Sequence, residues 1–425
     1  MKKSFYNFSF EVDGRNYIYN AMTNALAELS KHEKKSLDSF KCNKHMENSD
    51  FIHELKYGGF VIDDYVDELN VIKEKLLRSR YSSNELDLVI APTLGCNFRC
   101  AYCFENTQSD LSIMSEDVQN QLVNFTRNQL HHKDALNVTW YGGEPLLAMQ
   151  VIEDLTKQFI ALSSELEVEY RASMVTNGFL INEAMFERLK ECHVNHMQIT
   201  LDGVEEGHDV RRPLQNGGSS FYQIVNGLQI LAKNVVPVSL RVNVDRRNQG
   251  AFEQVVSFLA ERNLLENISP YPGIITDLTG FSEDKVCFNM DEIYTIEESA
   301  KTILNKRLIN DHLYDYPISK SNYCGADQID SFVVDPYGYI YPCWDEIGRR
   351  ECAISHVSDK QQDSISMDRS RYLLYDVTED PFCRDCRVLP ICMGGCPHQR
   401  ISGHHDCIVE KEYLLERLKY YIEHN

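Results

Sequence analysis

Short apolar runs alternate with amphipathic stretches of helical length from residue 86 onward. Within the longer stretches, apolar residues recur every three or four positions, as on one face of a helix. Six predicted strands cover residues 86–91, 137–141, 169–176, 196–201, 238–244 and 267–271. Five predicted helices cover residues 117–131, 149–164, 182–191, 221–233 and 251–264. This α/β pattern predicts βαβ units and a parallel sheet.

Six strands are too few to close an eight-stranded barrel, so the pattern favours a partial (β/α)6 barrel or an open sheet. In both architectures, functional sites lie at the carboxyl ends of the strands. The first predicted strand is followed at once by Cys96, Cys100 and Cys103. We therefore expect the chemistry of this protein at that edge of the sheet.

The region before residue 86 has a different pattern. Two aromatic-rich runs within residues 5–20 flank Asp13-Gly14, and such a pair between two runs indicates a β-hairpin. Helical patterns follow at residues 22–29, 50–55 and 67–77. The sequence therefore predicts a small unit of a hairpin and helices that ends near Ser83.

The last hundred residues are rich in loops. Residues 331–343 are typical of a second hairpin, with residues 335–338 as its turn. Residues 380–407 hold five cysteines, and an amphipathic helix closes the chain. Three consecutive domains are predicted, and they cover residues 1–83, 84–315 and 316–425.

Charge and composition narrow the classes of function. The 425 residues carry a net charge of −21, which argues against a large nucleic-acid footprint because phosphates attract basic clusters. The first residues, MKKSFYNFSFEVDG, have no sustained apolar core, so no signal peptide is expected. The chain also has no apolar run long enough for a transmembrane helix. We expect a cytoplasmic protein without a membrane partner, in a compartment where thiols stay reduced.

The fourteen cysteines are distributed unevenly. Without export, a disulfide framework is not expected. Three cysteines stand at positions 96, 100 and 103, and seven more form a group beyond residue 320. Cys42, Cys192 and Cys287 are scattered, as isolated buried cysteines usually are. Cys352 lies within the span of the second group and its role stays open.

Three thiols at such close spacing can converge on one metal centre. Structural zinc sites are closed by four ligands, and this segment offers only three. A [4Fe–4S] cluster has four irons, so three thiolates leave one iron free to bind another molecule. The missing fourth cysteine therefore favours a catalytic iron–sulfur cluster over a structural metal site.

The segment CNFRCAYC at residues 96–103 resembles the CxxxCxxC signature of the radical S-adenosylmethionine (SAM) enzymes. The resemblance includes Tyr102, the aromatic residue before the third cysteine. It implies that Cys96, Cys100 and Cys103 are catalytic and bind a [4Fe–4S] cluster whose open iron chelates S-adenosylmethionine. It also implies cleavage of that cofactor to a 5′-deoxyadenosyl radical, with an electron donor such as flavodoxin or ferredoxin.

Further motifs at strand ends agree with this family. Gly142-Gly143-Glu144-Pro145 matches its GGEP motif and Thr176-Asn177 matches its TNG motif, although a Gly-Gly-x-Pro segment is also an ordinary turn. Arg212 ends an HDxxR pattern and is suited to the carboxylate of the cofactor, unless it is simply solvated. The residues that the resemblance implies for cofactor binding are Tyr102, Gly142, Gly143, Glu144, Thr176, Asn177 and Arg212.

The second cysteine group resembles the SPASM domain of peptide-modifying radical SAM enzymes, which holds two auxiliary iron–sulfur clusters. By position, the first auxiliary cluster takes Cys324, Cys343 and Cys396. The second takes Cys383, Cys386, Cys392 and Cys407. Zinc is the rival interpretation. The family often supplies one more cysteine soon after the first, and this chain has none between Cys324 and Cys343. Either Cys352 fills that place or one iron stays open.

Residues 1–83 are similar to the small PqqD-like domains that recognise leader peptides. An exposed strand there could pair with an incoming peptide, or the region is only a cap on the barrel. The resemblance implies a maturase that acts on a ribosomally synthesised precursor peptide and forms a thioether or a carbon–carbon crosslink. The alternatives are an anaerobic sulfatase-maturing enzyme, which makes formylglycine, and a non-enzymatic metal scaffold.

One departure bears on the choice between the two enzymes. In the sulfatase-maturing family an aspartate directly follows the second SPASM cysteine and acts as a base. Here Trp344 follows Cys343, and Asp345 comes one position later. If this stretch is a strand, a shift of one residue turns the side chain to the other face. The departure therefore favours the thioether maturase. Trp344 then stands where the base of the sulfatase-maturing family would be, or it is a packing residue.

Overall fold

The computed structural model describes residues 1–40, 50–103, 110–275, 287–306, 316–359, 367–403 and 407–424, so Cys42 lies outside the described residues. The chain groups into two compact units. Unit 1 comprises Met1–Ser82, His312–Asp327 and Leu374–Asn425. Unit 2 comprises Ser83–Asp311 and Gln328–Leu373. No helix within the described residues has the length and apolar character needed to cross a membrane.

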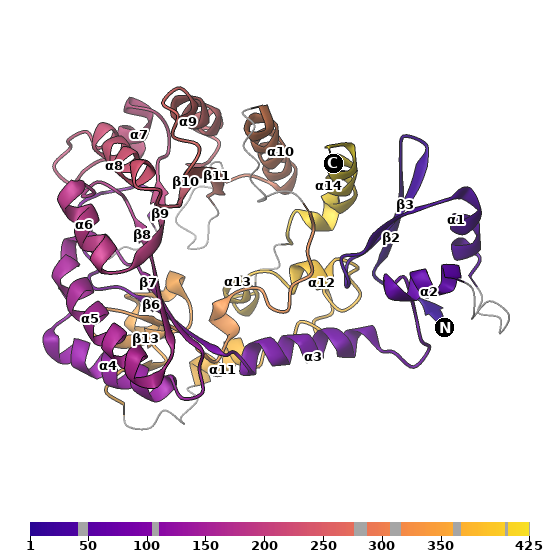
Figure 1. Cartoon of the computed structure of the whole chain (residues 1–425), viewed down its shortest axis with the longest axis horizontal. Coiled ribbons are helices and arrows are strands. Elements are labelled where there is room, and N and C mark those ends of the chain that lie inside the picture. The colour runs from indigo at the N-terminus through magenta and orange to yellow at the C-terminus, as the bar shows by residue number, and fades with distance from the viewer. Residues whose placement is uncertain are drawn as a thin grey trace. The chain divides into compact units, whose positions relative to one another are not determined.

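Unit 2 contains the predicted parallel sheet. Its six strands pair in chain order and in parallel, as Figure 1 shows for the curved sheet. The strands are β6 (Glu85–Ile90), β7 (Ala135–Trp140), β8 (Glu169–Thr176), β9 (Val194–Thr200), β10 (Val238–Val244) and β11 (Ile268–Ile274). The predicted α/β fold class is confirmed.

Helices between these strands line the outer side of the curved sheet (Figure 1). The five predicted helices correspond to α4 (Glu116–Gln129), α5 (Met149–Leu166), α6 (Glu183–Glu191), α8 (Phe221–Lys233) and α9 (Ala251–Ala260). Side chains cap two of them, since Ser115 accepts from the Val118 amide and Asn182 from the Met185 amide. The helices α7 (Glu206–Arg211) and α10 (Met290–Lys306) were not predicted.

The predicted hairpin at residues 331–343 extends this sheet. It consists of β12 (Ser331–Val334) and β13 (Tyr339–Tyr341), and β14 (Ser355–His356) pairs with β13. Gly338 closes the turn at a φ of +89°, a backbone conformation that favours glycine. The strand β12 runs parallel to β6, so this hairpin belongs to the sheet of unit 2, although the sequence placed it in the third domain.

In unit 1, the predicted N-terminal hairpin is β2 (Asn7–Val12) with β3 (Arg15–Asn20). Asp13 and Gly14 both have positive φ, as a two-residue turn of this kind requires. The helix predicted at residues 22–29 is wrong, because residues 26–29 form the strand β4 (Leu26–Leu29) beside β3. The Asn20 side chain accepts from the amides of Met22 and Thr23, which turns the chain back into the sheet.

Three helices and a second, two-stranded sheet complete the N-terminal part. The predicted patterns at 50–55 and 67–77 correspond to α2 (Asp50–Tyr57) and α3 (Glu68–Tyr81). The helix α1 (Lys31–Asp38) was missed, although Ser30 and Glu33 form a capping box that signals its start. The two-stranded sheet pairs β1 (Lys2–Lys3) with β5 (Val61–Ile62).

Both ends of the chain share one hydrophobic core in unit 1. Buried residues of β2, β3 and α3, such as Phe10, Tyr19 and Leu76, belong to the same cluster as Leu389 and Leu414. The C-terminal elements of this unit are η3 (Gly325–Asp327), α12 (Leu389–Cys392), α13 (Pro397–Ile401) and the predicted closing helix α14 (Glu410–His424). The structure thus joins the two ends of the chain, which the three consecutive predicted domains kept apart.

A buried ion pair reinforces this junction. The Arg80 guanidinium on α3 lies 2.7 Å from the Asp327 carboxylate on η3, and both side chains are less than 5% exposed. Arg80 also donates to the backbone oxygen of Tyr375. Burial outweighs the attraction of Arg80 and raises the pKa of Asp327. The pair therefore ties an N-terminal helix to the segment that follows Cys324.

Candidate functional site

The segment of residues 96–103, called here the cysteine loop, begins six residues after β6 ends. Its start is held by Thr93, whose hydroxyl donates to the Ser112 oxygen and accepts from the Gly95 amide. Ala91 and Leu94 pack against Tyr341 and other residues of the β12–β13 hairpin. The hairpin that was assigned to the third domain therefore supports the first cysteine motif.

The three thiols of the cysteine loop influence one another electrostatically. Burial raises the pKa of Cys96 to about 12, and Cys100 and Cys103 add to the shift. The Phe98 amide opposes it by donating to the Cys96 sulfur over 3.4 Å. Burial also raises the pKa of Cys100, against the attraction of Arg212. Thiols in such surroundings become thiolates only when a cation compensates them, as a bound metal centre does.

The site lacks the geometry of a mononuclear metal. Among the described residues, no group of three or more His, Cys, Asp or Glu side chains is arranged to hold one metal ion. A cluster with several irons binds each thiolate through a different iron, so its ligands need not meet at one point. The donor set of three neighbouring thiols fits such a cluster.

Gly142 and Gly143 lie directly against the backbone that leads into the cysteine loop. A Cβ atom at Gly142 would stand 2.4 Å from the Thr93 oxygen, and Gly142 has a φ of +103°. A Cβ atom at Gly143 would stand 2.3 Å from the Leu94 oxygen. No side chain fits at either position. The two glycines therefore serve close backbone packing in addition to any contact with a ligand.

Glu144 joins the ends of three neighbouring segments. Its fully buried carboxylate accepts from the Thr176 hydroxyl over 2.7 Å and from the Asn177 amide over 2.8 Å. Its own amide donates to the Gly95 oxygen over 2.9 Å. Burial raises the pKa of Glu144, and these hydrogen bonds oppose the shift. Glu144 thus holds the end of β8 through its carboxylate and the residue before the cysteine loop through its amide.

Asn177 connects this corner to the cysteine loop. Its side-chain amide donates to Asn97 over 2.8 Å and lies 3.9 Å from the Cys96 sulfur. Thr176 donates to Glu144 and accepts from the Gly178 amide, so its hydroxyl is used within the protein. The structure therefore brings the predicted residues of the GGEP and TNG motifs together with Cys96.

Tyr102 and Arg212 meet in a buried polar network. The Arg212 guanidinium donates to the Tyr102 hydroxyl over 2.8 Å, and the same hydroxyl donates to the Asp202 carboxylate. Asn243, at the end of β10, also donates to Tyr102 over 3.1 Å. Burial is the largest influence on both groups: it raises the pKa of Tyr102 and works against the raised pKa of Arg212. Asp202 raises the pKa of both. The network joins the cysteine loop to the ends of β9 and β10.

Arg212 keeps unused binding capacity. It is 7% exposed, it lies over the Phe98 ring, and its Nε has no hydrogen-bond partner. A buried guanidinium with a free donor is a natural partner for a carboxylate. The neighbouring His208 is fully buried with a free Nε2, and burial lowers its pKa to about 3. These atoms fit an anionic ligand beside the cysteine loop.

Sequence reasoning did not assign Asp202 or Asn243 to the site. Asp202 accepts from the Asn243 amide over 3.0 Å, and its own amide donates to His208 Nδ1 over 3.2 Å. The available signal was a polar residue at or just after the end of a predicted strand. Such residues face the same edge of a parallel sheet as the cysteine loop.

The four cysteines predicted for the second auxiliary cluster all belong to unit 1. Burial raises the pKa of Cys383 to about 12, Arg400 opposes the shift, and Cys392 and Cys386 add to it. Cys407 accepts from the Lys411 ammonium over 3.2 Å, and Cys386 also raises the pKa of that lysine. We call these four residues the C-terminal cysteine group: Cys383, Cys386, Cys392 and Cys407.

The cysteines predicted for the first auxiliary cluster divide between the units. Cys324 and Cys396 belong to unit 1, where both act on Tyr323, whose pKa burial raises to about 12. Cys343 belongs to unit 2. The assignment of these three cysteines to one cluster stays a prediction. Cys352 ends the short helix η5 (Arg350–Cys352) and packs on the cluster that contains Tyr341.

The expectation that residues around Trp344 form a strand is wrong. Trp344–Glu346 is the short 3-10 helix η4, so the argument from strand alternation does not apply to Asp345. The Asp345 carboxylate lies 4.0 Å from the Cys343 sulfur. Trp344 is 42% exposed, and its ring meets the Tyr141 ring edge to face at 5.2 Å. The tryptophan therefore packs on Tyr141, the residue that precedes Gly142.

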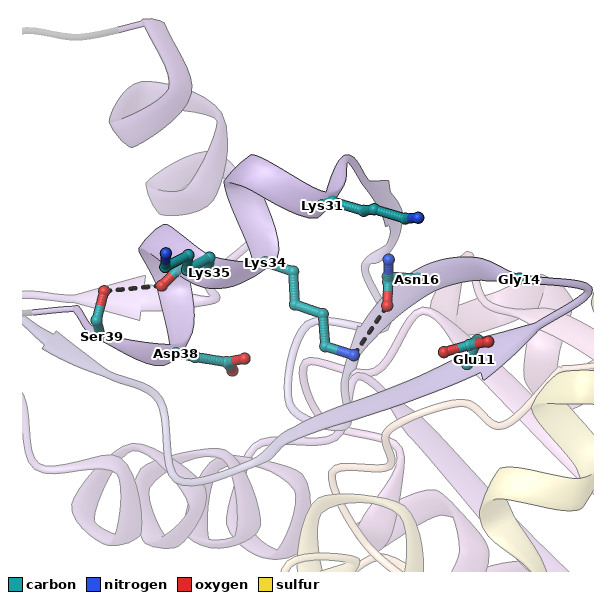
Figure 2. A pocket seen from close by; sticks show the side chains of 8 residues that line it. All are labelled: Glu11, Gly14, Asn16, Lys31, Lys34, Lys35, Asp38 and Ser39. Atoms are coloured by element: carbon teal, nitrogen blue, oxygen red, sulfur yellow. Dashed lines mark hydrogen bonds between the residues drawn. The ribbon is translucent and has the colours of Figure 1, made fainter.

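A cavity of about 670 Å³ lies in unit 1, between α1 and the N-terminal hairpin (Figure 2). Three lysines on α1, two acids and three small or polar residues line it. They are Glu11, Gly14, Asn16, Lys31, Lys34, Lys35, Asp38 and Ser39. Lys34 donates to Asn16 over 2.8 Å, whereas Lys31 and Lys35 are exposed. The cavity offers ammonium groups to a ligand that carries acidic groups.

Comparisons with known proteins agree with this geometry. The family model described as the radical SAM superfamily matches residues 90–259. A cysteine-type anaerobic sulfatase-maturating enzyme of Clostridium perfringens is 23% identical over 370 residues, which are 80% of this chain and 96% of that protein. A serine-type enzyme of Klebsiella aerogenes is 25% identical over 329 residues, which are 72% of this chain and 78% of that protein.

Two solved structures have a similar fold. The enzyme anSMEcpe, bound to AdoMet and the Cp18Cys peptide, matches with a TM-score of 0.62 and 20% identity. That match covers 80% of this chain and 96% of the other. Streptococcus suis SuiB, bound to its precursor peptide SuiA, matches with a TM-score of 0.55 and 15% identity. It covers 96% of this chain and 98% of SuiB.

Proposed function

Because residues 90–259 of this chain are a radical SAM domain, we propose that the protein is a SPASM-type peptide maturase. Radical SAM enzymes use S-adenosylmethionine and a [4Fe–4S] cluster. The proposed reaction takes hydrogen from a ribosomally made precursor peptide and forms a thioether or, alternatively, a carbon–carbon crosslink. In the thioether case one S–H bond and one C–H bond break and one S–C bond forms. One hydrogen atom would pass to the 5′-deoxyadenosyl radical, and the other hydrogen would leave as a proton while an iron–sulfur cluster accepts its electron.

Different residues in and around the cysteine loop would bind the cluster and S-adenosylmethionine. Cys96, Cys100 and Cys103 would bind the cluster, and Arg212 would face the cofactor carboxylate with its free Nε. When bound, the cluster and S-adenosylmethionine supply a 5′-deoxyadenosyl radical. The backbone at Gly142 and Gly143 would meet the cofactor amino group, and Tyr102 would orient Arg212 through their hydrogen bond.

Glu144 and Asn177 act as positioning residues in this proposal. Both oxygens of the Glu144 carboxylate accept hydrogen bonds, Oε1 from Leu146 and Thr176 and Oε2 from Asn177, so the side chain holds the strand ends in place. Asn177 places its amide beside the Cys96 sulfur. A donor beside a ligating sulfur stabilises the thiolate form.

The observation that carries the maturase proposal is the extent of the likeness to SuiB. It covers 96% of this chain, whereas the likeness to anSMEcpe covers 80%. The larger coverage supports a protein that carries a peptide-binding N-terminal region in addition to the radical SAM core and the auxiliary cysteines. Three [4Fe–4S] clusters are proposed in all, with the SPASM cysteines as assigned above.

The N-terminal region is proposed to bind the leader of the precursor. Its three-stranded sheet has two edge strands, β2 and β4, that could pair with an extended peptide. The lysine-lined cavity next to that sheet would take acidic side chains of the same peptide (Figure 2). We further propose a cytoplasmic enzyme that receives its electrons from flavodoxin or ferredoxin, because cytoplasmic thiols stay reduced.

A second candidate is the formation of formylglycine, and Asp345 favours it. Its carboxylate lies 4.0 Å from the Cys343 sulfur, close to where the sulfatase-maturing family places its base. Against it, the residue directly after Cys343 is Trp344, which packs on Tyr141. Because Asp345 is only two residues from Cys343, the two would be close in either kind of enzyme. The chemical identity of the product therefore has to distinguish the two functions.

Mass spectrometry of precursor co-expressed with this enzyme tests the proposal. A thioether product is lighter by two hydrogen atoms, and its modified cysteine resists alkylation. The same mass loss with every thiol still alkylatable would indicate a carbon–carbon bond. Formylglycine, with the sulfur lost, would replace the maturase proposal with the second candidate. Precursor co-expressed with a Cys96/Cys100/Cys103→Ala variant is the control and should stay unmodified.

A further inference from the structure

A lysine contacts the C-terminal cysteine group directly, and a buried arginine reaches it through the backbone of Gly394. The Lys411 ammonium on α14 donates to the Cys407 sulfur over 3.2 Å. Arg400 on α13 is 6% exposed and donates through Nε to the Gly394 oxygen. The Gly394 amide in turn donates to the Cys392 sulfur. Arg400 is therefore connected to the Cys392 sulfur through one intervening residue, Gly394.

The electrostatics agree with this placement. Burial works against the charge of Arg400, but Cys383, Tyr375, Cys392 and Cys407 together raise its pKa. The hydrogen bond to Cys407 is the largest influence that raises the pKa of Lys411. Each cation thus gains from negative charge on the sulfurs, and by the same interaction it stabilises that charge.

We propose that Arg400 and Lys411 raise the reduction potential of the iron–sulfur cluster held by the C-terminal cysteine group. The inference rests on the proposed function, which assigns those four cysteines to the second auxiliary cluster. Reduction adds one electron to the cluster and one negative charge to the buried site. Net charge and hydrogen bonds to the sulfurs are known determinants of cluster potential. A fixed positive charge nearby favours the reduced form.

The two residues should differ in the size of their effect. Arg400 is buried, so its charge acts through a medium of low dielectric constant. Lys411 is exposed, and salt screens exposed charges over a Debye length of about 8 Å at physiological ionic strength. We expect Arg400→Gln to lower the ratio of reduced to oxidised cluster, at a fixed potential, by about tenfold, or about 59 mV for one electron. Lys411→Gln should lower the same ratio by a smaller factor.

The test uses full-length protein in which Cys96, Cys100 and Cys103 are alanine, so that only the auxiliary clusters remain. A potentiometric titration followed by electron paramagnetic resonance measures the midpoint potential of each cluster. Lys419→Gln is the matched control, because it removes the same charge from the same helix two turns away from Lys411. Arg400→Lys keeps the charge and should restore most of the shift.

The outcomes separate the inference from the proposed function. Two clusters with one midpoint potential lowered by Arg400→Gln and Lys411→Gln, but not by Lys419→Gln, support the inference. Two clusters with both potentials unmoved overturn it and leave the proposed function intact. If the Arg400→Gln variant loses a cluster, the midpoint potential of the Lys411→Gln variant alone tests the inference, because Lys411 lies on the exposed helix surface. Iron below two clusters before any of these substitutions contradicts the cluster assignment itself.

Discussion

The cysteine loop and the C-terminal cysteine group are supported in different ways. The cysteine loop depends on short backbone contacts with neighbouring strand ends, above all those of Gly142, Gly143 and Glu144. The C-terminal cysteine group instead rests on a hydrophobic core that the first eighty residues share with the last fifty. The first site should therefore be sensitive to single atoms nearby, and the second to packing far away in the sequence.

The largest effect is expected from removal of the cysteine loop thiols. The Cys96/Cys100/Cys103→Ala variant should lose all cleavage of S-adenosylmethionine, because the one cluster proposed to bind it is lost. Its iron should fall from about twelve to about eight per chain, at four irons per cluster. Anaerobic reconstitution with iron and sulfide analysis measures this. Cys287→Ala, outside both groups, is the control, and stoichiometric zinc with little iron in the native protein would contradict the enzyme proposals.

Gly143→Ala should act on the cysteine loop alone. A methyl group 2.3 Å from the Leu94 oxygen forces the start of the loop to move. Misplacement by about 1 Å can reduce a rate by about a hundredfold, so we expect a loss of that order in cleavage of S-adenosylmethionine. Gly207→Ala is the control, because its Cβ would meet nothing within 4 Å. Equal rates in both variants would show that the loop does not depend on this contact.

Arg80→Met should act on the C-terminal cysteine group without touching it. Removal of one partner of a buried ion pair costs about 3–5 kcal/mol of stability, because Asp327 stays buried without its cation. Thermal unfolding should therefore release iron from the auxiliary clusters at a lower temperature, while the radical cluster is retained. The double variant Arg80→Met/Asp327→Leu leaves no buried charge unpaired and should recover most of the loss. Identical stability of the single and double variants would argue against the pair as the cause.

A charge reversal in the lysine-lined cavity should affect only the precursor. Lys31→Glu with Lys35→Glu should raise the KM for the full-length precursor several-fold and weaken its dependence on salt, because charges at a binding site mainly steer association. Cleavage of S-adenosylmethionine without precursor should not change. Lys2→Glu with Lys75→Glu makes the same change in net charge away from the cavity. A KM unaffected by the cavity variant would support the interpretation of this region as a cap.

The smallest effect concerns pH. Burial lowers the pKa of His208 to about 3, from an ordinary value near 6.5. Below about pH 6.5 the unfolded chain therefore binds a proton that the folded chain does not, and stability falls by up to about 1.4 kcal/mol per pH unit. His208→Gln should flatten the decline of the melting temperature between pH 6.5 and 5. An unchanged decline would mean that other groups control it.

The same comparison explains why a truncation at residue 83 is a poor test of leader binding. Such a truncation removes Phe10, Tyr19, Ile72 and Leu76 from a core that also contains Leu414. Exposure of that core destabilises the C-terminal cysteine group directly, whatever the N-terminal region binds. Substitutions at the surface of the cavity separate the two roles, because they leave the core in place.

Features with a local cause followed from the sequence alone. The spacing of Cys96, Cys100 and Cys103, the alternation of strands and helices and the turn at Asp13-Gly14 depend on neighbours in the chain. Hydrophobic periodicity and turn chemistry report such neighbours directly. The family motifs at Gly142–Glu144 and at Thr176 followed for the same reason, since each stands just after a predicted strand.

Only the tertiary structure decided features that join distant segments. Residues 26–29 became a strand because β3 offered hydrogen bonds that outweigh a weak helical pattern. β12 joined β6, and Asn243 joined Tyr102, across more than a hundred residues of sequence. Arg400 and Lys411 reached the C-terminal cysteine group through the folding of a loop-rich segment without periodicity. Burial and pairing between distant residues leave no periodic mark on the sequence, so packing alone determines these contacts.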